Sequence, residues 1–197
     1  MNKQHEVWAG DFGADYTRRN DKPWQPRVRF WREIMDRTKA TKVFEVGCNM
    51  GLNLNAIRSV RPEAHLGGCD VNEYALSLAR AAGHRNVHEC RAKDIAHEIG
   101  GYGYDLVFTA GVLIHIPPDD LDQVCAAIVE SSTRWVLAIE YESKSGDEEE
   151  VVYQGQRKML WRRNYGNIYW KMGLSIIEKR PAEGFDRCTA VLLEKVK

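Results

Sequence analysis

The order of apolar and polar positions along the chain predicts short buried strands that alternate with amphipathic helices. The expected strands are 41–46, 65–70, 87–90, 104–111 and 135–140, and the helices between them are 52–60, 72–82, 94–99 and 119–130. The run 104–111 is almost continuously apolar, which is typical of a strand buried on both faces of a parallel sheet. This alternation predicts an α/β fold with a doubly wound parallel sheet.

The segments after the fifth strand follow a different pattern. The stretch 143–150 is polar and acidic and is predicted to be a solvated loop, whereas 154–172 is interpreted as a helix rich in aromatic residues. The runs 175–179 and 188–194 are predicted to be two further strands that pair as a closing antiparallel hairpin. A seven-stranded, mostly parallel sheet with helices on both faces follows.

The amino-terminal segment 1–25 is unlike the rest of the chain. Aromatic residues, among them Trp8 and Tyr16, are interleaved with glycines and charges. Such a segment is either a floppy terminus or a layer that packs over the remainder. Because disordered tails are poor in aromatic residues, we favour the packed layer. A leading helix is then expected to begin near Pro26 and to run to about Thr38.

Length and charge limit the function classes. The chain has 197 residues, with 28 Lys and Arg against 28 Asp and Glu, so its formal net charge is zero. A length of this size suits one domain, divided into a lid 1–25, a leading helix 26–40, a cofactor-binding core 41–142, and a substrate-side helix with a closing hairpin 143–197. The balanced charge predicts no broad attraction to nucleic acid or to membranes.

The cysteines and the amino terminus indicate the compartment. Five cysteines are scattered singly without a CxxC pair, which favours small buried side chains in a reducing cytoplasm over metal ligands. The first residues lack the apolar stretch of a signal peptide, and no apolar run reaches transmembrane length. We therefore expect a cytoplasmic protein that uses no metal.

The most informative stretch is Val43-Phe44-Glu45-Val46-Gly47-Cys48-Asn49-Met50-Gly51-Leu52, a strand followed by a glycine turn and the start of a helix. Glu45 lies within the strand, where an acid is costly unless it has a partner. Gly47 and Gly51 leave room for a ligand to approach the backbone. This layout is typical of a nucleotide-type cofactor site at the carboxyl end of a first parallel strand.

The spacing resembles motif I, E/D-x-G-x-x-x-G, of the class I S-adenosylmethionine-dependent methyltransferases. Asp70 follows 25 residues after Glu45, where a carboxylate can accept hydrogen bonds from two ribose hydroxyls. The resemblance implies an adenine contact near Asp94 and a methionine contact at the end of the fourth strand. The cofactor residues expected from the motif and from these positions are Glu45, Gly47, Cys48, Asn49, Gly51, Asp70, Val71, Asp94, Ile95 and Gly111.

Each of these elements has an alternative explanation when it is taken alone. Asp70 also suits a helix cap before Asn72, and Asp94 also suits an N-cap. NAD is the rival cofactor, but the dinucleotide pattern G-x-G-x-x-G requires a glycine where Asn49 stands. The combination, in order and at successive strand ends, favours S-adenosylmethionine as the cofactor and S-adenosylhomocysteine as its product.

The amino-terminal segment W-x-G-x-F-G-x-x-Y-x-x-R-N, from Trp8 to Asn20, narrows the resemblance. Together with motif I it resembles a bacterial group of methyltransferases associated with pseudaminic acid biosynthesis. The resemblance covers most of the chain and implies a role in surface polysaccharide biosynthesis.

Catalytic candidates lie where the cofactor's methyl group is expected. An alcohol acceptor loses a proton as it attacks, and His115, just after the fourth strand, is a candidate base, with Glu140 at the end of strand 135–140 as a second. His115 also suits a strand-end residue satisfied by the backbone. The residues that we expect to act in the lid or on the substrate are Tyr16, Arg19, Asn20, Arg162 and Arg163. The arginines suit either an anionic ligand or ordinary surface ion pairs.

The functional hypothesis is a cytoplasmic methyltransferase that acts on a small molecule, by O-methylation of a sugar, nucleotide sugar or related anionic metabolite. An RNA or protein methyltransferase is an alternative, although the chain has no basic stripe and no recognition module. A non-catalytic subunit that binds S-adenosylmethionine is another. The sequence predicts no particular oligomeric state.

Overall fold

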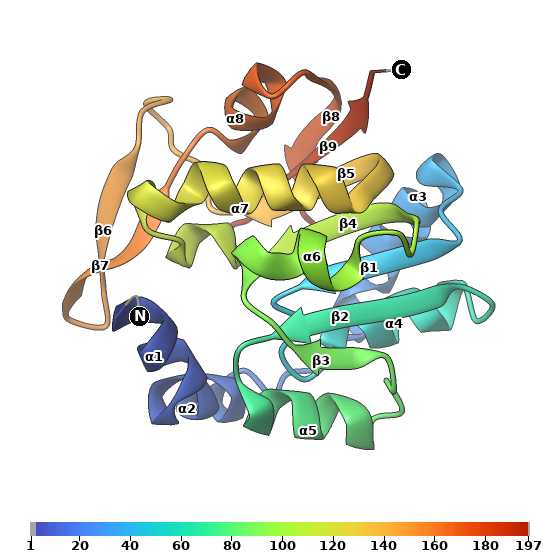
Figure 1. Cartoon of the computed structure of the whole chain (residues 1–197), viewed down its shortest axis with the longest axis horizontal. Coiled ribbons are helices and arrows are strands. Elements are labelled where there is room, and N and C mark those ends of the chain that lie inside the picture. Colours follow the sequence, from blue (N-terminus) through green and yellow to red (C-terminus); the bar gives the residue numbers. More distant parts are fainter. Residues whose placement is uncertain (1–2, 197) are drawn as a thin grey trace.

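The computed structural model describes residues 3–196, and its centre is a seven-stranded sheet. The strands are β1 Lys42–Val46, β2 His65–Asp70, β3 Val87–Glu89, β4 Tyr104–Ala110, β5 Ser132–Glu140, β8 Leu174–Pro181 and β9 Thr189–Lys195. Their order is β3-β2-β1-β4-β5-β9-β8 (Figure 1). Neighbours among β1 to β5 run parallel, and β9 runs antiparallel to both β5 and β8. The predicted seven-stranded sheet with a closing hairpin is confirmed.

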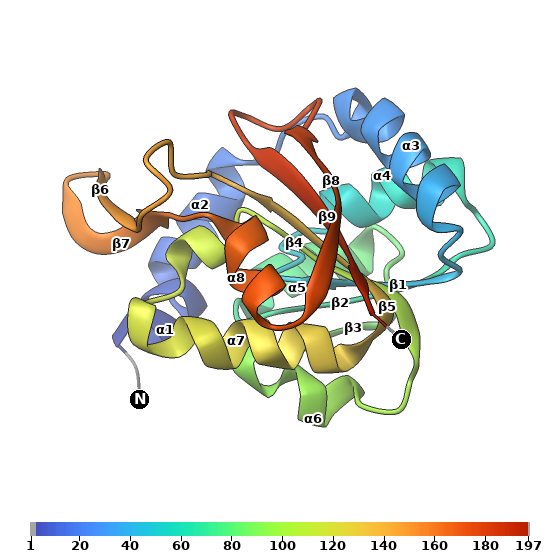
Figure 2. The ribbon, with the colours of Figure 1, turned by 90° about the horizontal axis from the view of Figure 1, so that it is seen from above.

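Helices cover both faces of this sheet (Figure 2). One core contains buried residues of α3 Val28–Thr38, α4 Leu52–Val60 and α5 Glu73–Ala81. The other contains buried residues of α6 Ile95–Ile99, α7 Pro118–Ser131 and α8 Tyr165–Lys171. Both faces of β4 are buried, with Phe108 in the first core and Val107 in the second, as its apolar run predicts. Within residues 3–196, no helix has the length and apolar character needed to cross a membrane.

The amino-terminal segment forms two helices, α1 Lys3–Ala9 and α2 Asp11–Arg19. They lie near the carboxyl ends of the parallel strands (Figure 1). A 3-10 turn, Gln25–Arg27, leads into α3. Helix α2 continues through Gly13 without a break, and Gly13 is buried. The aromatic segment packs against the rest of the chain.

The helix predicted over 154–172 is wrong for its first part. Residues Glu149–Tyr153 form strand β6 and Gln156–Arg162 form strand β7, a separate antiparallel pair, and only Tyr165–Lys171 is helical. Gln154 and Gly155 join the two strands with φ of 49° and 76°, as a two-residue type I′ turn requires. This hairpin projects away from the seven-stranded sheet, on the side of the molecule where α1 lies (Figures 1 and 2).

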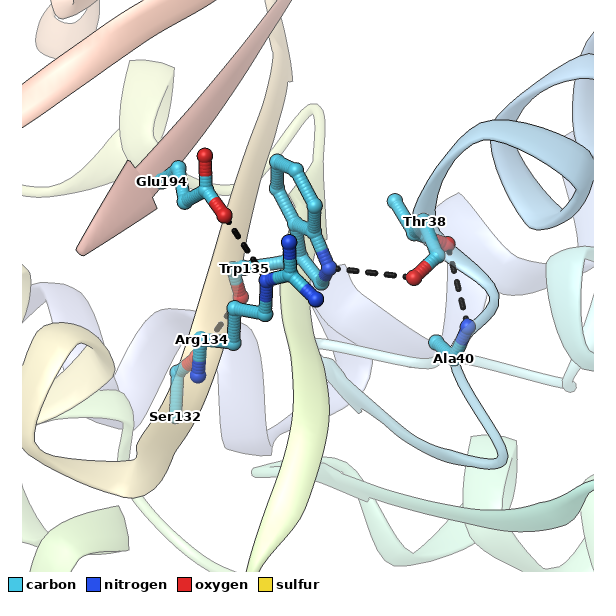
Figure 3. Close-up of polar contacts among 6 residues, drawn as sticks. All are labelled: Thr38, Ala40, Ser132, Arg134, Trp135 and Glu194. Carbon is cyan, nitrogen blue, oxygen red and sulfur yellow. Dashed lines mark hydrogen bonds and ion pairs between the residues drawn. The ribbon is translucent and has the colours of Figure 1, made fainter. Parts of the chain in front are cut away.

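Polar contacts hold together the end of the sheet opposite α1 and α2 (Figure 3). The indole of Trp135 on β5 donates a 3.1 Å hydrogen bond to the carbonyl of Thr38, the last residue of α3. Arg134 pairs with Glu194 on β9 at 2.7 Å. These contacts join α3 and β9 to the start of β5, so this end of the sheet is closed and the loops at the other end are free to form a site.

Candidate active site

A cavity of about 680 Å³ lies at the carboxyl ends of β1, β2, β4 and β5. Its wall is completed by residues of α1, α2, the β6–β7 hairpin and the loop 182–188 between β8 and β9. The predicted site residues that line it are Tyr16, Arg19, Asn20, Glu45, Gly47, Cys48, Asn49, Asp70, Val71, Gly111 and His115. Six predicted residues are not part of its wall in the described chain, namely Gly51, Asp94, Ile95, Glu140, Arg162 and Arg163.

The turn after β1 is shaped by two glycines with different roles. Gly47 has φ of +71°, and a Cβ there would stand 2.4 Å from a methyl group of Val112. Gly51 has φ of +79° and begins α4, and a Cβ there would stand 2.8 Å from the ring of His84. Only glycine suits both positions. Gly47 therefore lets the backbone of the turn approach Val112 in the cavity wall. Gly51 lets the turn pack against His84, outside the cavity.

Glu45 is buried at the floor of the cavity. Asn53 donates a 2.6 Å hydrogen bond to its Oε1, while Oε2 has no partner within the described chain. Burial raises the pKa of Glu45 to about 8. The guanidinium of Arg27 donates to the Oδ1 of Asn53 at 2.8 Å, and burial lowers its pKa. This corner therefore offers a carboxyl oxygen without a hydrogen-bond partner beside a half-buried cation.

Arg27 lines the cavity but was not predicted to do so. It follows Pro26 at the entry to α3, where an arginine is usually solvated. The sequence indicates its position only indirectly, because its partner Asn53 is the second residue of the helix that follows the glycine turn.

Asp70 ends β2, and its carboxylate faces the turn after β1. Its Oδ2 accepts from the N–H of Asn49 at 2.8 Å and its Oδ1 from the N–H of Asn72 at 3.0 Å. Burial raises its pKa, while these hydrogen bonds act in the opposite direction. The N-cap of α5 is Asn72, whose Oδ1 accepts from the N–H of Ala75. A carboxylate has about four acceptor positions, so Asp70 can accept two more hydrogen bonds from a ligand.

The segment after β3 differs from the expectation. Asp94 pairs with Arg91, and Ile95, the first residue of α6, is fully buried in the core. The cavity wall is formed instead by the residues just before them, which are Cys90, Arg91, Ala92 and Lys93. The predicted segment is therefore near the cavity, but the predicted side chains do not face it.

His115 stands on the opposite side of the cavity, in the 3-10 turn Leu113–His115 after β4. Its Nδ1 is 2.6 Å from the carbonyl oxygen of Met159 on β7, and its ring lies 4.5 Å from that of Trp8 and 5.3 Å from that of Tyr153. A carbonyl only accepts, so Nδ1 carries the proton. Burial lowers the pKa of His115 to about 4. The ring is therefore neutral near pH 7, and its Nε2 can accept a proton.

Glu140 and Arg163 hold the loop that carries His115. The carboxylate of Glu140 accepts from the N–H groups of Val112 and Leu113, both at 3.2 Å, and Ile114, at 3.4 Å. Arg163 donates to the carbonyls of Leu113 at 2.8 Å and Ile116 at 2.9 Å. Both side chains are almost fully buried. Neither side chain lines the cavity in the described chain, and both contact the loop that carries His115 instead. The expected roles of Glu140 as a base and Arg163 as a substrate ligand stay predictions.

The outer part of the cavity is aromatic and carries several charges. Tyr16, Tyr141 and Tyr153 come from three separate segments, and Phe185 lies on the loop between β8 and β9. The charged residues of this part are Arg19, Lys22 and Asp186. Burial raises the pKa of Tyr16, so its phenol is neutral and can donate a hydrogen bond. Asn20 donates to the carbonyl of Tyr16 and closes the end of α2.

Residues 44–133 match the family model described as a methyltransferase domain. No curated protein matches the chain.

Several solved structures share the fold. A sugar N-methyltransferase, KedS8 of Streptoalloteichus, has a TM-score of 0.72 at 13% identity, over 96% of this chain and 94% of that one. The 1,6-didemethyltoxoflavin N1-methyltransferase of Burkholderia thailandensis was solved with bound 1,6-didemethyltoxoflavin and S-adenosylhomocysteine. It has a TM-score of 0.72 at 17% identity, over 100% of this chain and 92% of that one. The magnesium protoporphyrin IX methyltransferase of Synechocystis was solved with S-adenosylmethionine. It has a TM-score of 0.67 at 14% identity, over 100% of this chain and 98% of that one.

Residues 44–133 match a methyltransferase domain, and the whole chain has the fold of class I methyltransferases. The chain is an enzyme that uses S-adenosylmethionine as its methyl donor. The residues present fit this cofactor, because the cavity holds an unpartnered carboxyl oxygen at Glu45, a glycine-lined wall at Gly47, and spare acceptor capacity at Asp70.

Proposed function

We propose that the enzyme methylates a hydroxyl group of a small anionic acceptor, in particular an acidic sugar or a nucleotide sugar of surface polysaccharide biosynthesis. The observation that carries the proposal is the neutral imidazole of His115 at the wall of an aromatic cavity whose outer part holds Arg19 and Lys22. Aromatic faces suit the apolar face of a ring, and the two cations suit a carboxylate or phosphate. The amino-terminal motif that contains Arg19 supports the same acceptor class.

The inner part of the cavity would hold the cofactor. Asp70 would accept from the ribose hydroxyls, and the carboxyl group of Glu45 with Arg27 would hold the amino acid end. Cys90 and Ala92 would line the adenine. When bound there, S-adenosylmethionine supplies an electrophilic methyl carbon.

His115 would act as the general base. Its Nε2 accepts the proton of the acceptor hydroxyl as the oxygen forms its bond to the methyl carbon. The ring would gain a positive charge when it accepts this proton. Met159 holds the ring through Nδ1 and thereby selects the tautomer that has a free Nε2.

The proposal is tested by binding and then by turnover. We expect S-adenosylhomocysteine to raise the melting temperature of the purified protein, because a ligand that binds only the folded state stabilises it by mass action. Differential scanning fluorimetry measures this shift. Labelled methyl transfer to a panel of neutral sugars, acidic sugars and nucleotide sugars then identifies the acceptor. Tight binding of cofactor with transfer only to RNA or protein would contradict the proposed acceptor class.

Replacing Asp70 by Ala should weaken binding of S-adenosylhomocysteine by about tenfold or more. Hydrogen bonds to a charged group are each worth about 1.5–3 kcal/mol, and the carboxylate has room for two from the ribose. Titration calorimetry measures the change. Asp94→Ala is the matched control, since Asp94 pairs with Arg91 and does not line the cavity. Equal affinities of the two variants would place the ribose elsewhere.

A further inference from the structure

The helices α1 and α2, residues 3–19 and here termed the lid, are attached to the body of the enzyme by two asparagines. The first is Asn72, which is 4% exposed. Its Nδ2 lies 2.9 Å from the carbonyl oxygen of Trp8, 3.2 Å from that of Ala9 and 3.1 Å from that of Gly10. A single amide group thus donates to the carbonyls where α1 turns into α2.

Gly13 allows this close approach. A Cβ on Gly13 would stand 1.9 Å from the carbonyl oxygen of Trp8 and 2.7 Å from the Nδ2 of Asn72. Gly13 lies within a regular helix, so its backbone conformation does not require glycine. The lid and Asn72 are therefore packed together with no space for any other side chain at position 13.

The second asparagine is Asn49, in the turn after β1. Its Nδ2 donates a 2.9 Å hydrogen bond to the hydroxyl of Thr17, which is fully buried and in turn donates to the carbonyl of Gly13. Both asparagines thus reach the same part of the lid, from two different loops of the cofactor end of the sheet.

Asp70 joins the two attachments. Each of its carboxylate oxygens accepts the backbone N–H of one of these asparagines, Oδ2 from Asn49 and Oδ1 from Asn72. A ligand that hydrogen-bonds to Asp70 therefore acts on the residues whose side chains hold the lid. The lid in turn supplies Trp8, Tyr16 and Arg19 to the wall of the cavity.

We propose that Asn72 is a positioning residue that couples cofactor binding to docking of the lid, so that a bound cofactor strengthens the attachment of the lid residues that line the acceptor subsite. This inference rests on the proposed placement of the cofactor ribose at Asp70. The coupling is reciprocal, so a lid that docks more tightly on the cofactor-bound enzyme also binds the cofactor more tightly by the same factor.

Asn72→Asp separates this role from the capping role of the same side chain. An aspartate keeps the oxygen that accepts from the N–H of Ala75, and a negative charge at the start of α5 is favourable. It replaces the donor to the three lid carbonyls by an acceptor that repels them. Asn164→Asp is the matched control, because Asn164 caps α8 in the same way, through the N–H of Asn167, and does not contact the lid.

Hydrogen exchange and calorimetry with S-adenosylhomocysteine measure the coupling. In the wild type and in N164D, the ligand should slow amide exchange in residues 5–19. In N72D, exchange there should be about tenfold faster at saturating ligand, and affinity for the ligand should be about tenfold lower. Thr17→Val, which removes the hydroxyl that Asn49 reaches, should shift both quantities in the same direction.

Two outcomes would decide against the proposals separately. A wild-type chain that does not bind S-adenosylhomocysteine contradicts the proposed function itself. Ligand binding together with lid protection in N72D equal to that in N164D contradicts the coupling alone. The melting temperatures of ligand-free N72D and N164D are the control for stability. If Asn72 had a merely structural role, the melting temperature of N72D would fall, but the effect of the ligand on amide exchange in the lid would not change.

Discussion

Replacing His115 by Asn should lower the rate of methyl transfer about 100-fold or more while the affinity for S-adenosylhomocysteine stays nearly unchanged. General bases contribute about 10²–10⁴-fold to a rate, and asparagine has no counterpart of the basic Nε2. Its amide nitrogen can still donate to the carbonyl of Met159, so the loop keeps that contact. Initial rates with the acceptor found in the screen, together with calorimetry, separate the two effects.

The pH dependence gives a second test of His115. Burial lowers its pKa to about 4, so the neutral form that accepts a proton is fully present above about pH 5. In the wild type, kcat/KM should show no inflection from His115 between about pH 5.5 and 8, and should fall only as the pH approaches 4. An H115N enzyme that turns over at the wild-type rate would exclude His115 from the mechanism.

Replacing Arg163 by Met should destabilise the folded state by about 3 kcal/mol, because hydrogen bonds from charged groups are worth about 1.5–3 kcal/mol each. The change leaves the carbonyls of Leu113 and Ile116 without their donor, although the apolar part of the side chain is retained. For a chain of this length the melting temperature should fall by roughly 6–12 °C. Urea unfolding measures the free energy directly.

Arg162→Met is the matched control for Arg163. Arg162 is the preceding residue on β7 and is partly exposed, so its loss should change the stability by less than about 0.5 kcal/mol. Equal unfolding midpoints of the two variants would show that the loop of His115 does not depend on Arg163.

Local signals predicted most of the sheet. The strand and helix on either side of the glycine turn, 42–46 and 52–60, are found where the apolar periodicity and Gly51 indicate them. The β6–β7 hairpin was missed because Met159, Leu160 and Trp161 form a continuous apolar run next to a true helix, and such a run does not distinguish a strand from a helix. The two residues of its turn, Gln154 and Gly155, were the overlooked signal.

The direction of side chains was harder to predict than the position of residues. Glu140 is the last residue of β5 and Tyr141 follows it, but Tyr141 lines the cavity while Glu140 turns to the loop 112–114. Neighbouring residues of a strand face opposite sides of a sheet, and the sequence does not say which side becomes the site. Arg27 was missed because its contact with Asn53 depends on how α3 packs against α4.

The contact between Gly13 and Asn72 has an evolutionary consequence. A Cβ at position 13 would meet the carbonyl oxygen of Trp8 at 1.9 Å as well as the Nδ2 of Asn72 at 2.7 Å, so glycine is required there whatever residue stands at position 72. Position 13 is thus constrained by the space where α1 turns into α2, whereas position 72 is constrained by the donor that it supplies to the lid carbonyls. Among homologous enzymes that keep this pair of helices, we expect glycine to be retained at position 13 even where residue 72 differs and the lid is attached in another way.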